Sequence, residues 1–170
     1  QPFFGFLLMS KLQFVKRDEI PTMATDGRKV YYNSAFVDLL PMKQLVGVLA
    51  HEVIHLALCH HTRRNNREFV KWNAACDFAI NPLLKTSGFE LPSGILYDPK
   101  FKDKYSEEIY SMLPPSMTFN GNGIGEVMDA TNEAGGRASS ADRALQEADW
   151  KVATAQAALI AKQRGKLPGD

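Results

Sequence analysis

The strongest hydrophobic pattern in the chain lies between Pro41 and Asn65. Apolar residues recur there at one-turn spacing on most sides of the segment, which predicts a largely buried helix from about Met42 to Arg63. Pro41 stands just before the first turn of this helix, and a pair of asparagines marks its end.

A second helix is predicted from about Arg67 toward Leu84, with a bend or interruption at Pro82. Most of this segment is apolar, but three polar residues recur four positions apart and therefore share one face. This polar stripe consists of Asn73, Asp77 and Asn81. A stripe of this kind on a buried helix needs polar partners, because an unpaired buried polar group is costly.

Shorter elements are predicted around these two helices. Strand-forming residues from Leu12 to Ile20 and from Lys29 to Asn33 flank the turn signal Thr25-Asp26-Gly27, so we expect a small sheet. The apolar opening, Pro2 to Met9, is expected to be a core segment, and Ser106 to Leu113 a short helix.

The composition divides the chain into three parts. Residues 1–116 are expected to form the core, residues 117–138 a glycine-rich flexible linker or loop, and residues 139–167 a long alanine-rich helix that packs on the core. The predicted fold class is therefore α+β, mainly helical with a small β-sheet.

Charge and cysteine content narrow the functional classes. The 170 residues include 20 basic and 19 acidic side chains, and this balance gives no field to hold nucleic acid or a membrane surface. The apolar opening is too short to cross a bilayer. Two cysteines without CxxC spacing favour reduced thiols and a cytoplasmic location. Because the chain starts at Gln1, we expect it to be an excerpt of a longer protein.

The first helix carries an HExxH motif formed by His51, Glu52 and His55. Histidines four positions apart lie on one helix face, so both imidazoles can bind one metal ion. Glu52 is placed to activate a metal-bound water as a general base. The motif predicts a zinc hydrolase, although two imidazoles and a carboxylate also accept cobalt or nickel.

A catalytic zinc usually takes three protein ligands, so one more ligand is required. His61 has the spacing of a metzincin ligand, but that pattern needs a glycine where this chain has Leu58. If the helix continues, His61 points about 80° away from His51 and His60 points to the opposite face. A histidine is therefore not the favoured third ligand.

An acid from the following helix is the favoured third ligand, with Asp77 the first choice and Glu68 the fallback. Other polar residues could bond the outer ring nitrogens of the ligand histidines and orient them. The candidates for this supporting role are Asn73, Asn81 and His60. If Asp77 instead has such a role, the third ligand lies elsewhere.

Several segments resemble the family of metallopeptidase domains found ahead of a von Willebrand A-like domain in bacterial and phage proteins. The most specific are the HExxH run and Asn73-Ala74-Ala75-Cys76-Asp77, and supporting matches run from Phe3 to Pro168. The resemblance implies a zincin-like fold with an HExxH active-site helix, with Asp77 as third ligand. It also implies that the natural protein continues past Asp170 into the von Willebrand A-like domain, served by a MoxR-type ATPase.

The function predicted from the sequence is zinc-dependent hydrolysis of peptide bonds in a peptide or protein substrate. Two alternatives stay open: a metal-stabilised protein interaction module with vestigial or gated activity, and a metal hydrolase that acts on a non-peptide bond. We also expect the segment from Arg28 to Asn33 to be an edge strand that receives an extended peptide by strand addition.

Overall fold

The computed structural model describes residues 2–115 and 124–165. In chain order the elements are α1 (Pro2–Lys11), β1 (Gln13–Lys16), β2 (Met23–Thr25), β3 (Lys29–Tyr32), α2 (Ser34–Leu39), α3 (Met42–Ala57), α4 (His60–Arg63), α5 (Phe69–Thr86), the 3-10 helix η1 (Pro99–Phe101), α6 (Ser106–Met112) and α7 (Ser140–Gln163). The fold is α+β, mainly helical with one small sheet, as the sequence predicts.

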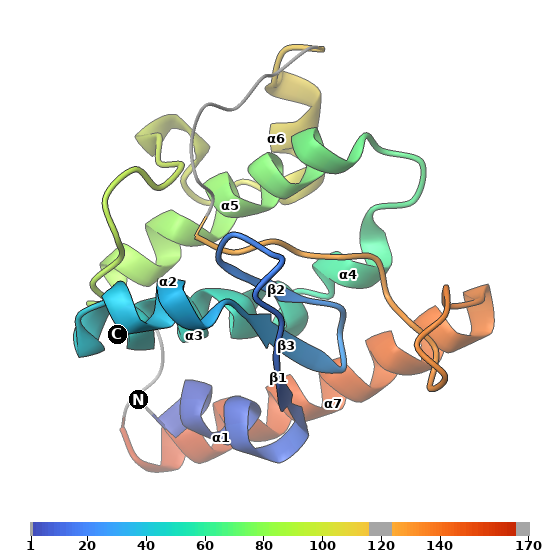
Figure 1. Ribbon diagram of the computed structural model, residues 1–170, viewed down its shortest axis with the longest axis horizontal. Helices are drawn as coiled ribbons and strands as arrows, with labels where there is room; N and C mark the ends of the chain where they lie inside the picture. Colours follow the sequence, from blue (N-terminus) through green and yellow to red (C-terminus); the bar gives the residue numbers. More distant parts are fainter. Residues whose placement is uncertain (1, 116–123, 166–170) are drawn as a thin grey trace.

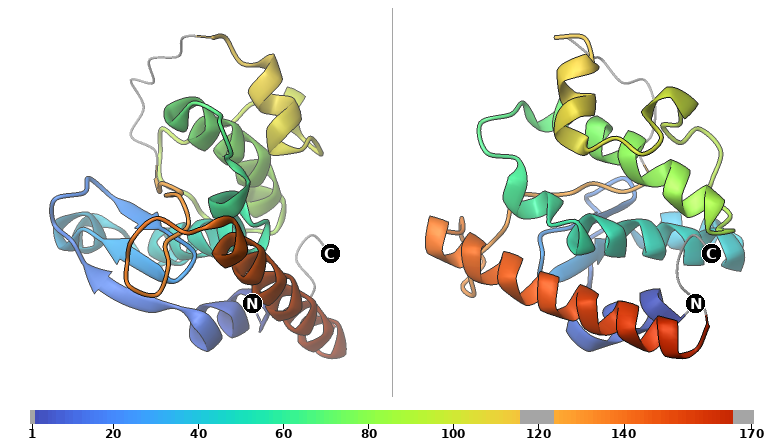
Figure 2. Two further views of the ribbon diagram at one scale, coloured as in Figure 1. Left: turned by 90° about the vertical axis from the view of Figure 1, so that its right-hand side faces the viewer. Right: turned by 180° about the vertical axis from the view of Figure 1, so that it is seen from behind.

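Helix α3 runs through the middle of the molecule (Figure 1). The helices α1 and α7 pack together on one side of it, and α5 and α6 on the other (Figure 2). This position explains why α3 is apolar on most sides: Val48, Val53 and Leu56 are fully buried in it. Its neighbours cover it so thoroughly that polar residues on α3 must find partners inside the protein.

The sheet has the strand order β1-β3-β2, with β3 parallel to β1 and antiparallel to β2. The expectation that Arg28–Asn33 is an edge strand is therefore wrong, because β3 is the central strand and both of its edges are paired. The short strand β2, which the sequence did not signal, is the edge strand that contacts α3.

The helix expected from Met42 to Arg63 is broken at Cys59. Cys59 adopts a left-handed backbone conformation with φ 55°, and α4 begins at the next residue. No glycine signals this turn, and cysteine rarely adopts the conformation. Because the chain turns here, His60 and His61 take directions that a continuous helix would not give them.

The apolar opening forms helix α1, whose Phe3, Phe4 and Leu7 are buried in the main core. They share this core with small residues of α7, whose Ala153 and Ala157 let the two helices approach closely. The start of α7 is fixed by a reciprocal pair of hydrogen bonds between Ser139 and Asp142, at the position the sequence predicts.

Part of the segment expected to be a linker or loop, residues 117–138, lies outside the described residues. Its remainder, residues 124–138, packs against the body of the protein, with Ile124 and Val127 buried. Backbone hydrogen bonds join Thr25 to Glu126 and Met128, so this segment extends the edge of β2.

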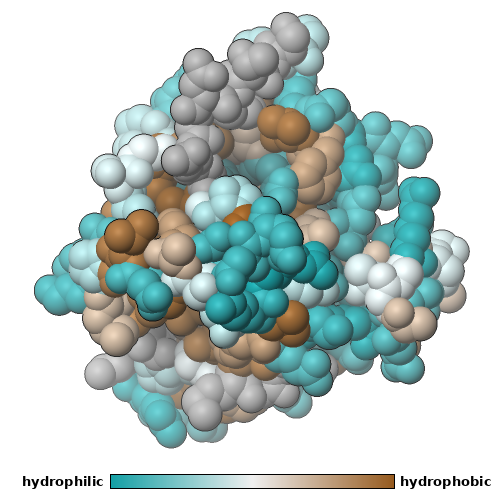
Figure 3. Space-filling view, viewed as in Figure 1, coloured by the Kyte–Doolittle hydropathy of each residue, from teal (hydrophilic) through white to brown (hydrophobic). Residues whose placement is uncertain are grey.

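The outer surface is mixed in character. Figure 3 shows hydrophobic residues gathered at the left of one face. Among the exposed large hydrophobic residues are Leu39, at the end of α2, and Met42, at the start of α3, which are 82% and 72% exposed. Within residues 2–115 and 124–165, no helix is both long and apolar enough to span a membrane.

Asp26 ties the sheet to the segment that follows residue 124. Its carboxylate accepts hydrogen bonds from the backbone N–H groups of Arg28 and Lys29 and from the hydroxyls of Tyr31 and Thr131. Burial works against the charged form, but these four bonds outweigh it and hold the pKa of Asp26 below its ordinary value. Its contribution to stability is therefore complete above pH 3.8, the value for the unfolded chain, and is lost as the pH falls through the lower folded pKa.

We expect Asp26→Asn to lower the free energy of unfolding by about 1–3 kcal/mol at neutral pH, because it removes the charge from a fully hydrogen-bonded buried carboxylate. Urea unfolding from pH 7 to pH 3 measures this, and the difference from the natural sequence should shrink as the pH falls below 3.8. The exposed Asp38→Asn is the control and should change stability by less than about 0.5 kcal/mol. A difference for Asp26→Asn that stays constant across this range would contradict the electrostatic explanation.

Candidate metal centre

Helix α3 directs His51 and His55 to the same side, as their four-residue spacing requires. Both side chains are completely buried, and their Nε2 atoms lie 2.9 Å apart. Asp77 reaches them from α5, with its Oδ1 3.5 Å from Nε2 of His51 and 3.4 Å from Nε2 of His55. Two imidazoles and one carboxylate oxygen thus converge on one point in the core.

Asn81 holds the ring of His51 in place through its Nδ1 atom. Its amide nitrogen donates to the carbonyl of Leu96, so its amide oxygen is left to accept from Nδ1 of His51 at 3.0 Å. A proton on Nδ1 leaves the lone pair of Nε2 free. This is the tautomer that a histidine needs to bind a metal through Nε2.

His60 supports His55 in a similar way, through the turn at Cys59. Nδ1 of His60 lies 3.0 Å from Nδ1 of His55, and Nε2 of His60 lies 3.0 Å from Oγ of Ser106. When His60 donates from Nε2 to Ser106, its Nδ1 accepts the proton of His55 Nδ1, and Nε2 of His55 is free. The sequence named His60 as a supporting candidate but expected a continuous helix, which would have turned it to the opposite face.

Asn73, the third member of the polar stripe, has a different contact. Its amide exchanges two hydrogen bonds with the backbone of Val127, which donates to Oδ1 at 2.7 Å and accepts from Nδ2 at 3.2 Å. Asn73 therefore contacts Val127 rather than the histidine rings. It anchors residues 124–128, the covering segment, which passes over the cluster. Each residue of the polar stripe thus has a partner. Asn81 bonds His51, Asp77 lies next to both histidines, and Asn73 holds the covering segment.

Glu52 lies beneath that covering segment. A Cβ atom added to Gly125 would come within 1.7 Å of Oε1 of Glu52, so only glycine allows the backbone to pass this close. Both carboxylate oxygens are buried and have no hydrogen-bond partner in the described part of the chain. Burial raises the pKa of Glu52 to about 8.

The charges in the cluster are unevenly shared. Burial opposes a proton on His51, yet the Asp77 carboxylate outweighs it and raises the pKa of His51. Burial and the nearby His51 together lower the pKa of His55 to about 4. Burial opposes the charge of Asp77, but His51 holds its pKa below the ordinary value.

The donor set fits a metal ion. Two neutral imidazole nitrogens and one carboxylate oxygen are ligands that zinc accepts, and Oδ1 of Asp77 is buried with no hydrogen-bond partner among the described residues. A second group, His55, His60 and Cys76, also brings its donor atoms within 4.8 Å of one another. It fits less well, because burial raises the pKa of the Cys76 thiol well above its ordinary value and disfavours the thiolate.

Two residues that contribute to the site, Ser106 and Gly125, were not predicted from the sequence. Both lie far along the chain from the HExxH motif, so no local spacing connects them to it. Glu68, the fallback ligand, instead caps α5 by accepting from the N–H groups of Val70 and Lys71.

A cavity of about 290 Å³ opens beside the cluster. Asp77 forms part of its lining, together with Met23 of β2 and the segment of Gly125 and Glu126. The N–H of Asn33 donates to the carbonyl of Thr22, so the backbone groups of the next residue, Met23, point away from β3. The cavity is therefore bordered by a strand edge.

The fold and this cluster define a candidate metal-binding α+β domain. The chain belongs to the family described as "Putative metallopeptidase domain", which matches residues 1–170. The family expected from the sequence is thus confirmed, and its description indicates a hydrolase that acts on peptides or proteins. Comparison with curated proteins and with solved structures gave no match.

We expect Gly125→Ala to destabilise the protein by about 1–3 kcal/mol, because the new methyl group collides with Glu52 and neither side can retreat from a packed site. Urea unfolding measures the change. Gly5→Ala is the matched control: a Cβ at Gly5 meets nothing within 4 Å, and alanine in α1 should leave stability unchanged or raise it by up to about 1 kcal/mol. Equal stability of Gly125→Ala and the natural sequence would show that the segment does not lie against Glu52.

Proposed function

We propose that this protein is a zinc-dependent metallopeptidase of the zincin-like type, with α3 as its active-site helix. The observation that carries the proposal is the convergence of His51, His55 and Asp77 on one point, beside the unpartnered carboxylate of Glu52. A histidine pair and an acid are a ligand set of catalytic zinc sites, which keep one position open.

In this proposal His51, His55 and Asp77 hold the ion, while Asn81 and His60 keep the two imidazoles in the metal-binding tautomer. Bound zinc supplies Lewis-acid polarisation of the reacting oxygens. Three protein ligands from two helices also cross-link α3 to α5, so the ion contributes to the stability of the fold.

Glu52 acts as the general base. It takes a proton from the attacking water and returns it to the nitrogen of the departing amine, so that the peptide bond breaks with no net change in the enzyme. Glu52 must be ionised for the first of these steps. Burial is the main cause of its raised pKa of about 8, and a cation held by its neighbours would lower that pKa.

The substrate, in this proposal, is an extended peptide bound in the cavity beside Asp77. Among the described residues the backbone N–H and carbonyl of Met23 have no partner, and in this proposal they bind the main chain of the peptide, so β2 takes the role that the sequence assigned to β3. Thr25, two residues along the same edge, is already paired with residues 126–128, which limits the free edge to the part next to the cluster.

An interaction module held together by a metal is the competing function. A structural site has no use for a buried carboxylate without a partner, and Glu52 is such a group within the described residues. Hydrolysis of a non-peptide bond would use the same residues, and the family description favours peptides. The von Willebrand A-like neighbour, the MoxR-type ATPase and the cytoplasmic location stay predictions.

We expect the natural sequence to retain one zinc ion per chain after dialysis and Asp77→Asn to bind zinc at least about 100-fold more weakly, because a ligand should matter no less than an outer-shell group. Mass spectrometry and competition with a chelator measure stoichiometry and affinity.

Cys76→Ser is the matched control for this experiment, since it changes the adjacent residue of α5 and the alternative donor group. Zinc binding that survives Cys76→Ser and is lost in Asp77→Asn supports the proposed ligands. The reverse pattern would move the metal to His55, His60 and Cys76, and a natural sequence that binds no zinc would overturn the proposal.

We expect Glu52→Gln to keep the zinc and to lower peptide cleavage by about 10²–10⁴-fold, because glutamine fills the same space but cannot accept the proton. Cleavage of a peptide library, followed by mass spectrometry, gives the readout alongside the zinc content. Full activity in Glu52→Gln would refute the general-base role, and loss of zinc would show that Glu52 serves the metal instead.

A further inference from the structure

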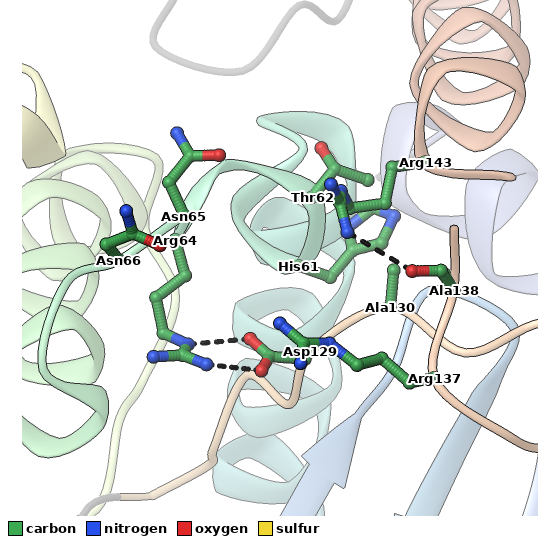
Figure 4. A pocket seen from close by; sticks show the side chains of 10 residues that line it. All are labelled: His61, Thr62, Arg64, Asn65, Asn66, Asp129, Ala130, Arg137, Ala138 and Arg143. Atoms are coloured by element: carbon green, nitrogen blue, oxygen red, sulfur yellow. Dashed lines mark hydrogen bonds and ion pairs between the residues drawn. The ribbon is translucent and has the colours of Figure 1, made fainter. Parts of the chain in front are cut away.

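A second cavity, of about 330 Å³, lies apart from the metal centre and shares no lining residue with the cavity beside Asp77. Its walls come from α4 and the turn that follows, from residues 129–138, and from the first turn of α7 (Figure 4). Ala130 and Ala138 pair through their backbones, so one wall is a short hairpin. The lining is predominantly polar and cationic.

Three arginines and one aspartate line this cavity. The carboxylate of Asp129 is bound on both oxygens by Arg64, so this pair is neutral and already satisfied. Arg143 donates to the carbonyl of Ala138, and the guanidinium of Arg137 has no ion pair within the described chain (Figure 4). The cavity therefore carries two positive charges that no carboxylate of its lining neutralises.

His61 supplies an independent indication of a ligand. Its imidazole lines the cavity, is 2% exposed, and has no hydrogen-bond partner on either ring nitrogen among the described residues. Burial lowers the pKa of His61 to about 4, so the ring is neutral and has one N–H to donate. A buried donor without an acceptor is costly, and an anion in the cavity would supply the acceptor.

We propose that this cavity binds a phosphate dianion, either free phosphate or a small phosphate monoester. Arg137 and Arg143 would neutralise its two charges, and a phosphate near pH 7 carries between 1.5 and 2 negative charges, roughly. Guanidinium groups match the oxygens of phosphate with paired N–H donors. Asn65 and Asn66, at the rim, add amide donors. The volume leaves room for the organic part of a monoester.

The position of the cavity links it to the segment that covers Glu52. Residues 129–138 form its wall, and the same segment continues back to Val127 and Gly125. A bound dianion would join this hairpin to α4 and α7 through charge-assisted hydrogen bonds. The site is independent of the proposed peptidase activity and is tested without it.

The test is isothermal titration calorimetry with inorganic phosphate and with glycerol phosphate, at constant ionic strength set with chloride. We expect Arg137→Gln and Arg143→Gln each to weaken binding by about tenfold or more, in line with hydrogen bonds to a charged group. Arg164→Gln, at the far end of α7, removes the same charge outside the cavity and should leave the affinity within about twofold. The tighter of the two ligands identifies the source of the phosphate.

Asp77→Asn separates this site from the metal centre, and we expect it to bind phosphate as the natural sequence does. The proposal would be overturned if phosphate bound only to the metal-loaded protein and equally well to Arg137→Gln and Arg143→Gln. It would also be overturned if Arg164→Gln weakened phosphate binding as much as these two variants do. Circular dichroism confirms folding, and Arg143→Lys keeps the charge if Arg143→Gln is unstable. Retained binding in Arg143→Lys supports the site, and no detectable phosphate binding by the folded natural sequence refutes it.

Discussion

The structure depends on the contact between α3 and α5, where four ionisable side chains meet in the core. His51, Glu52, His55 and Asp77 are all 3% exposed or less, in a protein of only 170 residues. Burying so many polar groups is unfavourable unless they satisfy one another. The surrounding residues supply most of these partners. The amide of Asn81 bonds Nδ1 of His51, and the imidazole of His60 bonds Nδ1 of His55. The carboxylate of Asp77 lies next to the Nε2 atoms of both histidines. Among the described residues, Oδ1 of Asp77 and both carboxylate oxygens of Glu52 are left without a hydrogen-bond partner, and this is the basis for proposing a metal site here.

Much of this arrangement could be predicted from the spacing of polar residues along the two helices. The spacing of His51 and His55 fixes their common direction on any helix, and the four-residue repeat of Asn73, Asp77 and Asn81 fixes a polar face on the next one. When two such helices pack in the core, their polar faces are expected to face each other, because burying either face against apolar residues would be costly. This is why the sequence could place Asp77 and Asn81 near the two histidines, where the structure has them, while the role of Asp77 as a metal ligand stays a prediction.

The remainder depends on backbone conformations and distant contacts that local patterns do not encode. Cys59 takes a left-handed conformation without being glycine, and the packing of α4 against α3 and α7 helps to hold it there. The strand β2 is three residues long and owes its existence to β3 and to residues 126–128. Glycines between 121 and 136 predict a loose segment, yet Gly125 is there because the backbone must pass directly over Glu52.

The long-range pairing of β2 with residues 126–128 also bears on the order of events during synthesis. A chain that has emerged only as far as residue 115 contains α3, α5 and every proposed metal ligand, but it lacks the segment of residues 124–128 that lies over Glu52. The contact between Trp150 and the carbonyl of Gly27 comes later still. Contacts so distant in sequence form slowly. In a nascent chain the proposed donor cluster is therefore complete before the segment of residues 124–128 can cover it, and the proposed metal ion would have its widest access to the site at that stage.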